Sequence, residues 1–332
     1  MNLIEAYRYL AALAQHRHFG RAATACHITQ PALSNALRAL EAHLGVAIVR
    51  RSRQYEGLTP EGEQVLATAH RVLREQEALR QQLAGSAEQP RGRLLIGAVP
   101  TAVPVAARFA ARLQARHSGV QPQVRSMASQ EIETGLDALA LDLGLGYAER
   151  AGRGTAPQVW PQYLEQYYVL THGPAASPNP TTDLAAGLAA DLAAPEPAGQ
   201  RLPPMTWADA ATRPLALLSA EMHNRVLIDA QFRRLGLAVQ PVLETNSVSA
   251  LLAAVQTGQL AAVLPGAVVA TVAGQPGWCA RPLGEPELRT PIAFMAAAGA
   301  RRSQALEAAL RLAADAEWLA EVARHSGQLG QG

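Results

Sequence analysis

An unbroken helical pattern near the N-terminus limits what this chain can fold into. The pattern continues from Glu61 to Leu83 without a residue that breaks it, which exceeds the ~8 to 20 residues of most globular helices. The segment that follows is polar and contains Gly and Pro, as hinges between domains do. We therefore assign a linker helix to residues 61–84 and a hinge to 85–92, between a small N-terminal unit and a larger C-terminal unit.

One face of the linker helix carries a mostly apolar stripe. Its members recur at heptad spacing and are Val65, Ala69, Val72, Gln76, Leu79 and Leu83. A helix that stands clear of both units would expose this stripe to water, so we expect it to pair with the same helix of a second copy. The alternative is that the stripe packs on its own domain.

Composition excludes several classes of protein. With 49% hydrophobic and 17% charged residues, the chain has the composition of a soluble globular protein. Charge or proline interrupts every apolar run well before the ~20 residues that span a bilayer. The acidic Glu5 in an amphipathic start does not suit a signal peptide. We expect a cytoplasmic protein with no membrane contact.

The two cysteines, Cys26 and Cys279, are far apart in the sequence. This spacing excludes a disulfide framework and a four-cysteine zinc site. We interpret both residues as buried thiols, and we expect neither a metal nor a cofactor.

Positive charge gathers at the front of the chain, although the formal net charge is only +2. Residues 1–60 contain seven arginines against three glutamates, an excess of four. Leu3, Tyr7 and Leu10 recur at helical spacing, and an alanine-rich second helix begins at Gly20. A small basic helical domain of this kind suits nucleic acid.

A third helix has clear start and stop signals. Thr29 is suited to cap it, Pro31 stands in the first turn, where a missing N–H is harmless, and Gly45 ends it. Together with the second helix and the turn from His27 to Thr29, it predicts a helix-turn-helix, whose last helix enters the major groove. Extended pieces at 46–49 and 55–58 around the basic RRSRQ indicate a β-hairpin wing.

The third helix has a polar face and an apolar face. The apolar face contains Ala32, Leu33, Ala36, Leu37 and Leu40. The polar face offers side chains that can pair with base edges. With the cap residue, the DNA-binding set of this helix is Thr29, Gln30, Pro31, Ser34, Asn35 and Arg38. An isolated polar face is commonly only a solvated surface, but beside a basic hairpin it indicates DNA recognition.

The segment GRAATACHITQPALSNALRALEAHLGVAIVRRSRQYEGLTPEGEQVL, residues 20–66, resembles the LysR family of bacterial transcription regulators. The small-residue helix, TQPALS, LRALEAHLGV, the basic wing and LTPEGE all occur in order. The resemblance implies that the polar face approaches bases or phosphates and that Arg51 and Arg53 hold the DNA backbone. A departure is Ile48 and Val49, where Leu and Phe are usual, and it concerns packing.

From residue 93 onward the pattern alternates between strands and helices, which is typical of α/β domains. LLIGAV, VQPQVRSM and LDLGLGY are separated by helices, and a second such unit follows EQYYVLTH. We expect two lobes joined at a waist, the first from about 93–164 and 268–300 and the second from about 165–267, with a final helix at 302–323. Residues 174–204, rich in Ala and Pro, are interpreted as a surface loop or partly helical insertion.

The predicted fold class is thus α/β with an all-α, winged-helix N-terminal domain. It consists of a winged helix-turn-helix at 1–60, the long linker helix and a two-lobed α/β effector domain at 93–332. Residues 93–300 are also similar to the effector domain of the LysR family, which resembles type 2 periplasmic solute-binding proteins.

Folds of this kind bind ligands between the lobes, where helix N-termini offer N–H groups to an anion or polar metabolite. The candidates are therefore the strand-to-helix junctions. They are Pro100, Thr101, Ser129, Gln130, His223, Asn224, Arg225, Asn246 and Ser247. The alternative for each is an ordinary helix cap.

The stretches TWADAATRPLALLSAEMHNR and ETNSVSALLAAVQTGQLAAVLP resemble a LysR subgroup associated with genes of formate and related anion metabolism. The family resemblance further implies a dimer that reads two half-sites, pairing of effector domains into a tetramer, and RNA polymerase as a partner.

Two other classes of protein fit less of the chain. An enzyme would need a catalytic set, yet GxSxG, HExxH and P-loop motifs are absent, and GLGYAE at 144–149 lacks the third glycine of a dinucleotide fingerprint. A plain solute-binding protein would explain the two lobes but not residues 1–83, and it would need an export signal. We therefore expect a regulator without catalytic residues, which binds promoter DNA and responds to a small polar or anionic metabolite.

Overall fold

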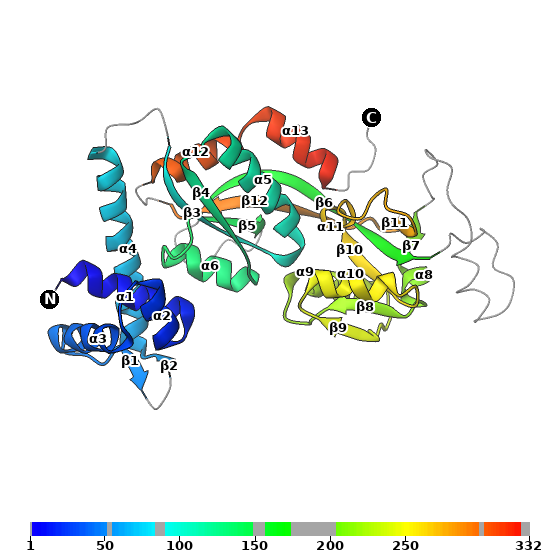
Figure 1. Cartoon of the computed structure of the whole chain (residues 1–332). Coiled ribbons are helices and arrows are strands. Elements are labelled where there is room, and N and C mark those ends of the chain that lie inside the picture. Colours follow the sequence, from blue (N-terminus) through cyan, green and yellow to red (C-terminus); the bar gives the residue numbers. More distant parts are fainter. Residues whose placement is uncertain are drawn as a thin grey trace, which may run out of the picture.

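A computed structural model of the chain describes residues 2–51, 55–83, 90–148, 157–173, 204–298 and 302–326. Figure 1 shows a small helical domain, a long helix that extends from it, and two lobes that share one strand. The insertion expected at 174–204 lies outside the described residues except for its last residue, as does most of the hinge expected at 85–92. Within the described ranges, no helix combines the length and the apolar character needed to cross a membrane.

The N-terminal domain is built from three helices and a hairpin around a leucine-rich core. Its elements are α1 (Leu3–His16), α2 (Phe19–Ala25), α3 (Gln30–Leu44), β1 (Val49–Arg51) and β2 (Tyr55–Leu58). The two strands pair antiparallel. Its fully buried leucines are Leu10, Leu13, Leu33, Leu37 and Leu40. Their spacing of three and four along α1 and α3 places them on the inner face of each helix.

Helix α4 (Pro60–Leu83) begins against the wing. The Thr59 hydroxyl donates to the Ala47 carbonyl at 2.6 Å and accepts from the Gly62 N–H at 2.9 Å. A Cβ on Gly62 would lie 2.1 Å from the Ile48 carbonyl oxygen, far inside contact distance. Only glycine therefore allows α4 to start this close to the wing.

The apolar stripe of α4 is divided between two environments. Ala69 is fully buried, and Val65 and Val72 pack against the core of the N-terminal domain. The expectation that the whole stripe is free is therefore wrong for these three residues, because α4 packs against α1 there. Leu79 is 49% exposed, so the free part of the stripe lies at the far end of the helix.

The first lobe is a mixed sheet with helices on both faces. Its strand order is β4-β3-β5-β12-β6, with β4, β3 and β5 parallel and the last two strands antiparallel to their neighbours. Helices α5, α12 and α13 cover one face and α6 covers the other (Figure 1). The elements are β3 (Gly92–Ala98), α5 (Val103–Arg116), β4 (Val120–Ser126), α6 (Ser129–Asp137), β5 (Leu143–Tyr147) and β12 (Arg289–Ala296).

Strand β6 (Gln158–His172) runs through both lobes. Its first part, up to Gln166, pairs with β12. Its second part, from Tyr167, pairs with β10 and β11. This continuous strand forms the waist between the lobes.

The second lobe continues the sheet in the order β6-β10-β8-β9. Helices α8 and α9 enclose one core around Trp207 and Phe232, and α10 and α11 enclose another around Leu251. The elements are β7 (Met205–Thr206), α8 (Trp207–Ala211), β8 (Leu215–Leu218), α9 (His223–Arg234), β9 (Leu243–Thr245), α10 (Val248–Gln256), β10 (Ala261–Pro265) and α11 (Gly266–Val269).

The chain stays in the second lobe longer than expected. The sequence pattern predicts that residues 268–284 belong to the first lobe, but β11 (Trp278–Gly284) pairs with the second part of β6 and with β7. The chain returns to the first lobe only with β12. A sequence pattern identifies strands but does not state which neighbour each strand pairs with.

The single helix expected at 302–323 is two helices, α12 (Gln304–Ala313) and α13 (Ala316–His325). The break occurs at Asp315, whose carboxylate accepts from the Trp318 N–H at 3.0 Å and so caps α13. The sequence on both sides is alanine-rich, so the helical pattern continues through Asp315 and the sequence does not reveal that this residue caps a new helix.

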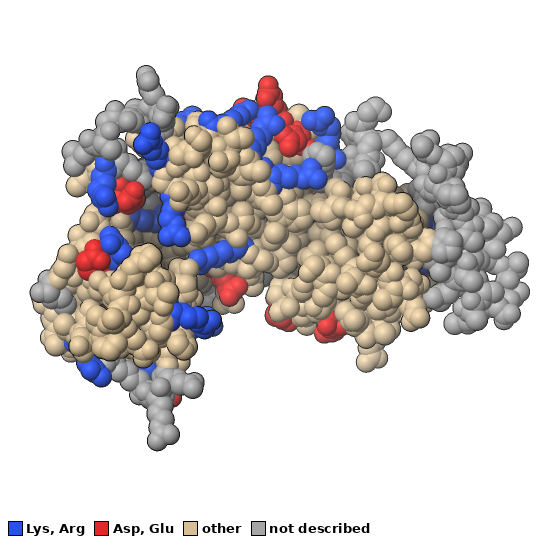
Figure 2. Space-filling view, viewed as in Figure 1, with Lys and Arg blue, Asp and Glu red and all other residues tan. Residues whose placement is uncertain are grey.

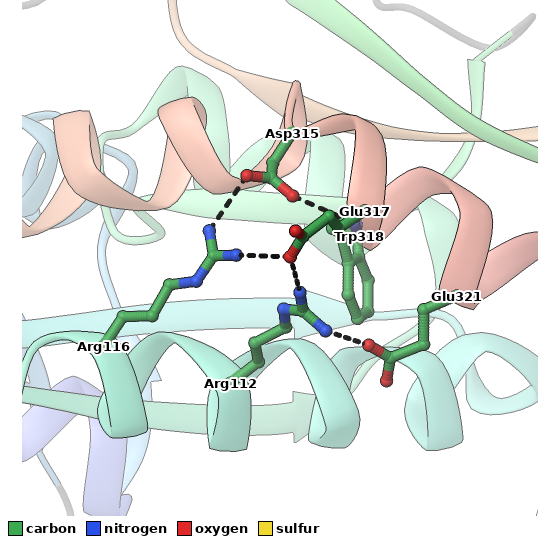
Figure 3. Close-up of polar contacts among 6 residues, drawn as sticks. All are labelled: Arg112, Arg116, Asp315, Glu317, Trp318 and Glu321. Atoms are coloured by element: carbon green, nitrogen blue, oxygen red, sulfur yellow. Dashed lines mark hydrogen bonds and ion pairs between the residues drawn. The ribbon is translucent and has the colours of Figure 1, made fainter.

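Ion pairs fasten α13 to α5 (Figure 3). Arg116 lies 3.0 Å from Asp315, Arg112 lies 2.9 Å from Glu317, and Arg112 also pairs with Glu321. The hydrogen bond from the Trp318 backbone N–H lowers the pKa of Asp315 below its usual value, and the hydrogen bond from Arg116 lowers it further. Because solvent reaches these charges, each pair contributes little to stability.

The buried ring of Trp318 contributes more than the ion pairs around it. It lies 5.2 Å from the Phe109 ring, centroid to centroid, and its Nε1 donates to Gln162 Oε1 at 2.7 Å. Trp318→Phe should destabilise this domain by about 1–3 kcal/mol, because it leaves the Gln162 oxygen buried and unpaired. Glu317→Gln is the control, and chemical denaturation that gave equal losses for both variants would contradict this account.

Candidate nucleic-acid interface and interlobe cleft

Helix α3 presents its predicted DNA-reading face to solvent. Gln30, Pro31, Asn35 and Arg38 are exposed, and Ser34 is half-buried. On the opposite face, Leu33, Leu37 and Leu40 are buried as expected. Ala32, expected on that face, is exposed, because the contact of α3 with the core begins at Leu33.

Local signals fix both ends of α3. The Thr29 hydroxyl accepts from the Ala32 N–H at 3.4 Å, so this residue serves as the cap. Gly45 ends the helix with φ 71°, a left-handed conformation that suits glycine. His27, with φ 56°, turns the chain between α2 and α3. This turn therefore sets the direction of α3 relative to α2.

Glu41 attaches the wing to α3. Its Oε1 accepts from the N–H groups of Ile48 at 3.0 Å and Val49 at 3.1 Å, so the first wing strand is tied to α3. The sequence does not single out Glu41, whose carboxylate is within α3 rather than at a cap. Arg53 and the side chain of Arg51, both predicted to hold the DNA backbone, lie outside the described part of the chain.

Figure 2 shows where charge gathers on one face of the molecule. Basic side chains are found over the N-terminal domain, along α4 and on the first lobe, whereas the second lobe presents mostly uncharged surface there. The uneven distribution gives the N-terminal side of this face a positive potential, which attracts polyanions.

Helix α4 is also held against the first lobe. The Arg74 Nη2 lies 2.9 Å from Asp142 Oδ1 and donates to the Leu141 carbonyl. Asp142 in turn accepts from the Leu95 N–H at 2.7 Å. The turn between α6 and β5 is therefore clamped between the linker helix and the sheet, a contact that the sequence does not predict.

A small cavity of about 10 Å³ lies between the lobes, with room for about one water molecule. Its lining residues are Val99, Pro100, Thr101, Ala128, Ser129, Tyr147, Leu218, Met222, His223 and Asn224. The structure thus brings together five of the nine predicted junction residues: Pro100, Thr101, Ser129, His223 and Asn224.

Helices begin at this cavity without a side-chain cap. The side chains of Ala102 before α5, Ala128 before α6 and Met222 before α9 make no capping hydrogen bond, although the Glu131 carboxylate accepts from the Ala128 N–H at 2.8 Å. The 3-10 turn η1 (Pro100–Ala102) leads into α5, and the single-turn α11 is uncapped as well. In contrast, polar side chains cap α1, α3, α8, α10, α12 and α13. The first-turn N–H groups at the cavity lack a side-chain acceptor, although helix starts normally have one.

Polar atoms in the cavity wall are buried without a hydrogen-bond partner among the described residues. They are Thr101 Oγ1, Ser129 Oγ, Tyr147 OH and Asn224 Oδ1. The Thr101 and Asn224 side chains nevertheless lie close enough to the Tyr147 hydroxyl to offset part of the rise in its pKa. Buried polar groups are almost always paired. A water or a small ligand in the cavity would supply the partners that these atoms lack.

Gln130, Asn246 and Ser247, also predicted as effector-binding residues, do not line this cavity. The first two are not buried, and the Ser247 hydroxyl caps α10 by accepting from the Ala250 N–H at 3.3 Å. The reason lies in the sheet order, because β9 is the edge strand and the junction that follows it is remote from the waist.

Arg225 does not line the cavity either, although it follows two residues that do. Its guanidinium donates to the Leu218 carbonyl at 2.9 Å and pairs with Asp229 and Glu244. It therefore braces the start of α9 against β8 and β9.

Two residues at the waist are missed by the sequence prediction. Tyr147 lines the cavity, with its ring 4.4 Å from that of His223. Glu165, on β6, is fully buried, and neither of its oxygens has a hydrogen-bond partner in the described structure. Burial raises the pKa of Glu165 to about 8. The one available signal is an acidic residue inside the apolar strand YLEQYYVL.

Two known families match parts of the chain. The family described as "Bacterial regulatory helix-turn-helix protein, lysR family" matches residues 4–63, and "LysR substrate binding domain" matches residues 190–318. Among curated proteins, the "DNA-binding transcriptional dual regulator OxyR" of Escherichia coli is 43% identical over 93 residues, 28% of this chain and 30% of that protein. The "SDS degradation transcriptional activation protein" of a Pseudomonas species is 40% identical over 100 residues, 30% of this chain and 33% of that protein. The matches thus span about a third of the length of these relatives.

Solved structures resemble the whole chain. A full-length OxyR carrying a single substitution, from Pseudomonas aeruginosa, is 25% identical, with 93% of this chain and 96% of that chain covered and a TM-score of 0.67. CbnR in complex with its target DNA is 18% identical, with coverage of 96% and 99% and a TM-score of 0.61. The second likeness concerns the fold alone.

Proposed function

The chain belongs to the LysR family of bacterial transcription regulators, and we propose that it binds promoter DNA under the control of a small polar or anionic metabolite held between its lobes. The observation that carries the DNA-binding half is the exposed polar face of α3 beside a wing tied to it by Glu41. In this proposal α3 enters the major groove, and Arg51 and Arg53 of the wing contact phosphates. The regulator acts in the cytoplasm.

The observation that carries the effector half is the cavity with unpaired polar groups. A ligand there would touch Thr101 and Ser129 from the first lobe and Asn224 from the second. A ligand that binds between two lobes joined by one strand shifts the equilibrium between their relative orientations.

A physical connection runs from this cavity to the DNA-binding domain. Helix α6 begins with Ser129 in the cavity wall, and the turn after it is held by Arg74 of α4. A ligand that moves the start of α6 therefore acts on the linker helix through a rigid element of nine residues. This contiguity supports the coupling, whose size an experiment must supply.

The oligomer is part of the proposal. Two copies paired through α4 place two recognition helices in successive major grooves, so the operator is an interrupted inverted repeat. Pairing of the C-terminal domains then gives a tetramer, and RNA polymerase is a partner at the promoter.

Selection of binding sites from a randomised pool of duplex DNA by the full chain tests the proposed function without a known operator. We expect an interrupted inverted repeat with half-sites about one helical turn apart, or a multiple of it. Enrichment of no sequence over the starting pool would contradict the DNA-binding proposal.

Thr101→Val separates ligand binding from folding. The Thr101 side chain is only 1% exposed and its hydroxyl is unpaired, so the isosteric change should leave the free protein as stable or slightly more stable. Loss of a hydrogen bond to the ligand should weaken binding about tenfold. Thermal shift of the full chain with a panel of small anions measures both, with Thr257→Val as the remote control. Undiminished shifts in Thr101→Val would place the ligand elsewhere.

A further inference from the structure

The interlobe cavity has no formal charge in its wall, yet its surroundings favour a negative ligand. None of the residues that line it is arginine or an acid. The N-termini of α6 and α9, which are nine and twelve residues long, each carry about half a positive charge. In α6 the Glu131 carboxylate, which accepts from the Ala128 N–H at 2.8 Å, partly offsets this charge. Arg225, the nearest cation by sequence, is already paired with Asp229 and Glu244. The cavity can therefore balance one negative charge at most, and it lacks the guanidinium that a dianion would need.

Two side chains in the wall point independently to a ligand. Thr101 and Asn224 are 1% and 3% exposed, and each has an oxygen atom without a hydrogen-bond partner in the described structure. Hydroxyl groups of Ser129 and Tyr147 are unpaired in the same wall. Three hydroxyl donors and the helix N–H groups suit an acceptor-rich oxyanion. A cavity of about 10 Å³ must widen to admit even a small one, which restricts the ligand to the smallest oxyanions.

The buried acid Glu165 interacts electrostatically with this wall. Among the causes that raise the pKa of Tyr147, a wall residue, the charge of Glu165 comes second after burial. The other groups that face Glu165 are Tyr163 and Tyr167 of its own strand, whose pKa values burial also raises. Thr290 is its partner across the β6–β12 ladder. No described cation pairs with Glu165, and the ring of His223 lies 4.4 Å from that of Tyr147, centroid to centroid.

The Tyr163 hydroxyl is close enough to favour the ionised form of Glu165 but does not reach hydrogen-bond geometry. Burial outweighs it, and the pKa of Glu165 is therefore raised to about 8. At neutral pH this carboxyl is therefore mostly protonated and uncharged.

We propose that the effector is a small monovalent oxyanion and that it binds only while Glu165 carries a proton. The proposal rests on the proposed function, since it names the ligand class of the same cleft. Ionised Glu165 would repel the anion across Tyr147 in a medium that screens charge poorly. A bound anion in turn raises the pKa of Glu165 further, so the anion and the proton bind cooperatively.

Calorimetric titration of the full chain with formate, the smallest carboxylate, tests this inference between about pH 6 and pH 9. We expect constant affinity below about pH 7 and a fall that approaches tenfold per pH unit above about pH 8. The sign follows from linkage, because the protonated form binds and is lost as the pH rises through the pKa of the free protein. Repeating the titration at about pH 8.5 in buffers of different ionisation heat should show proton uptake. Formamide, the neutral analogue of similar size, should bind at least tenfold more weakly and without pH dependence.

Substitutions test whether Glu165 is the group that carries the proton. Glu165→Gln should remove the fall in formate affinity above about pH 8, whereas Glu307→Gln, an exposed acid on α12, should leave it unchanged. If Glu165→Gln does not fold, Tyr163→Phe serves instead. Removing a hydroxyl that favours ionisation should move the fall to higher pH.

Several outcomes would overturn the inference. They are affinity that rises with pH, formamide binding as well as formate, a pH dependence that persists in Glu165→Gln, and no binding by formate, nitrite and nitrate alike. Selection of DNA sites is measured without any ligand, so its failure would refute the proposed regulator independently of the effector class.

Discussion

Replacing Gln30, Asn35 and Arg38 together by alanine is expected to abolish sequence-specific DNA binding. All three side chains are exposed on α3 and none contributes to the core. A good base-edge pair is worth about 1–3 kcal/mol, so three could remove about 3–9 kcal/mol if they act additively. Specific binding exceeds non-specific binding by about 4–10 kcal/mol. The variant should therefore bind the selected site little better than random DNA.

Two controls distinguish base reading from general weakening. His43→Ala, exposed at the other end of α3, should bind the selected site normally. Arg50→Ala, exposed in the wing, should weaken binding to all sequences and reduce the salt dependence by about one phosphate contact. Electrophoretic mobility shift and footprinting at several salt concentrations measure these effects. A triple variant that protects the selected site like the wild type would refute the assignment of α3.

The N-terminal domain is predictable because its signals are local. Thr29, Pro31 and Gly45 set the ends of α3 through contacts within a few residues, and the leucine spacing sets its inner face. Even Gly62, in the LTPEGE motif, has a purely steric reason to be glycine, which lies in its approach to Ile48. That reason is visible only once α4 and the wing are placed together.

The C-terminal domain is less predictable because its site depends on sheet order. The junctions after β3 and β8 reach the cavity, but the junction after β9 does not, because β9 is an edge strand. Strand order is set by long-range pairing that no local signal reports. For the same reason the sequence shows Glu165 as an acid in an apolar strand but not that this strand crosses between the lobes.

The exposed far end of α4 is the best place to test whether this helix forms the dimer contact. Val72 would be a suitable target if the whole stripe were exposed, but it packs against the N-terminal domain, so an acid there would disrupt that domain as well. Leu79 is 49% exposed and lies outside the core of that domain. It can therefore be changed without disturbing the fold.

Leu79→Asp should dissociate the dimer. Fully burying one leucine side chain contributes about 1.5–3 kcal/mol, and Leu79, at 49% exposed, has about half of that left to gain. Twofold symmetry makes each substitution count twice. The dimer should therefore weaken by about 1.5–3 kcal/mol, a factor on the order of 10 to 10², before the repulsion between two facing carboxylates is added. Sedimentation velocity at micromolar concentration should then show an assembly half the size of the wild type, because only the pairing of the C-terminal domains remains.

The same variant separates dimerisation from base recognition. Its α3 is intact, so binding to a single half-site should match that of the wild type, while the advantage of the complete inverted repeat should disappear. Arg71→Asp is the matched control, since it adds an acid to an exposed position on α4 without removing apolar surface, and it should dimerise normally. A Leu79→Asp protein that keeps the wild-type oligomeric state and full affinity for the inverted repeat would show that α4 is not the dimer contact and that the pairing of recognition helices must come from the C-terminal domains.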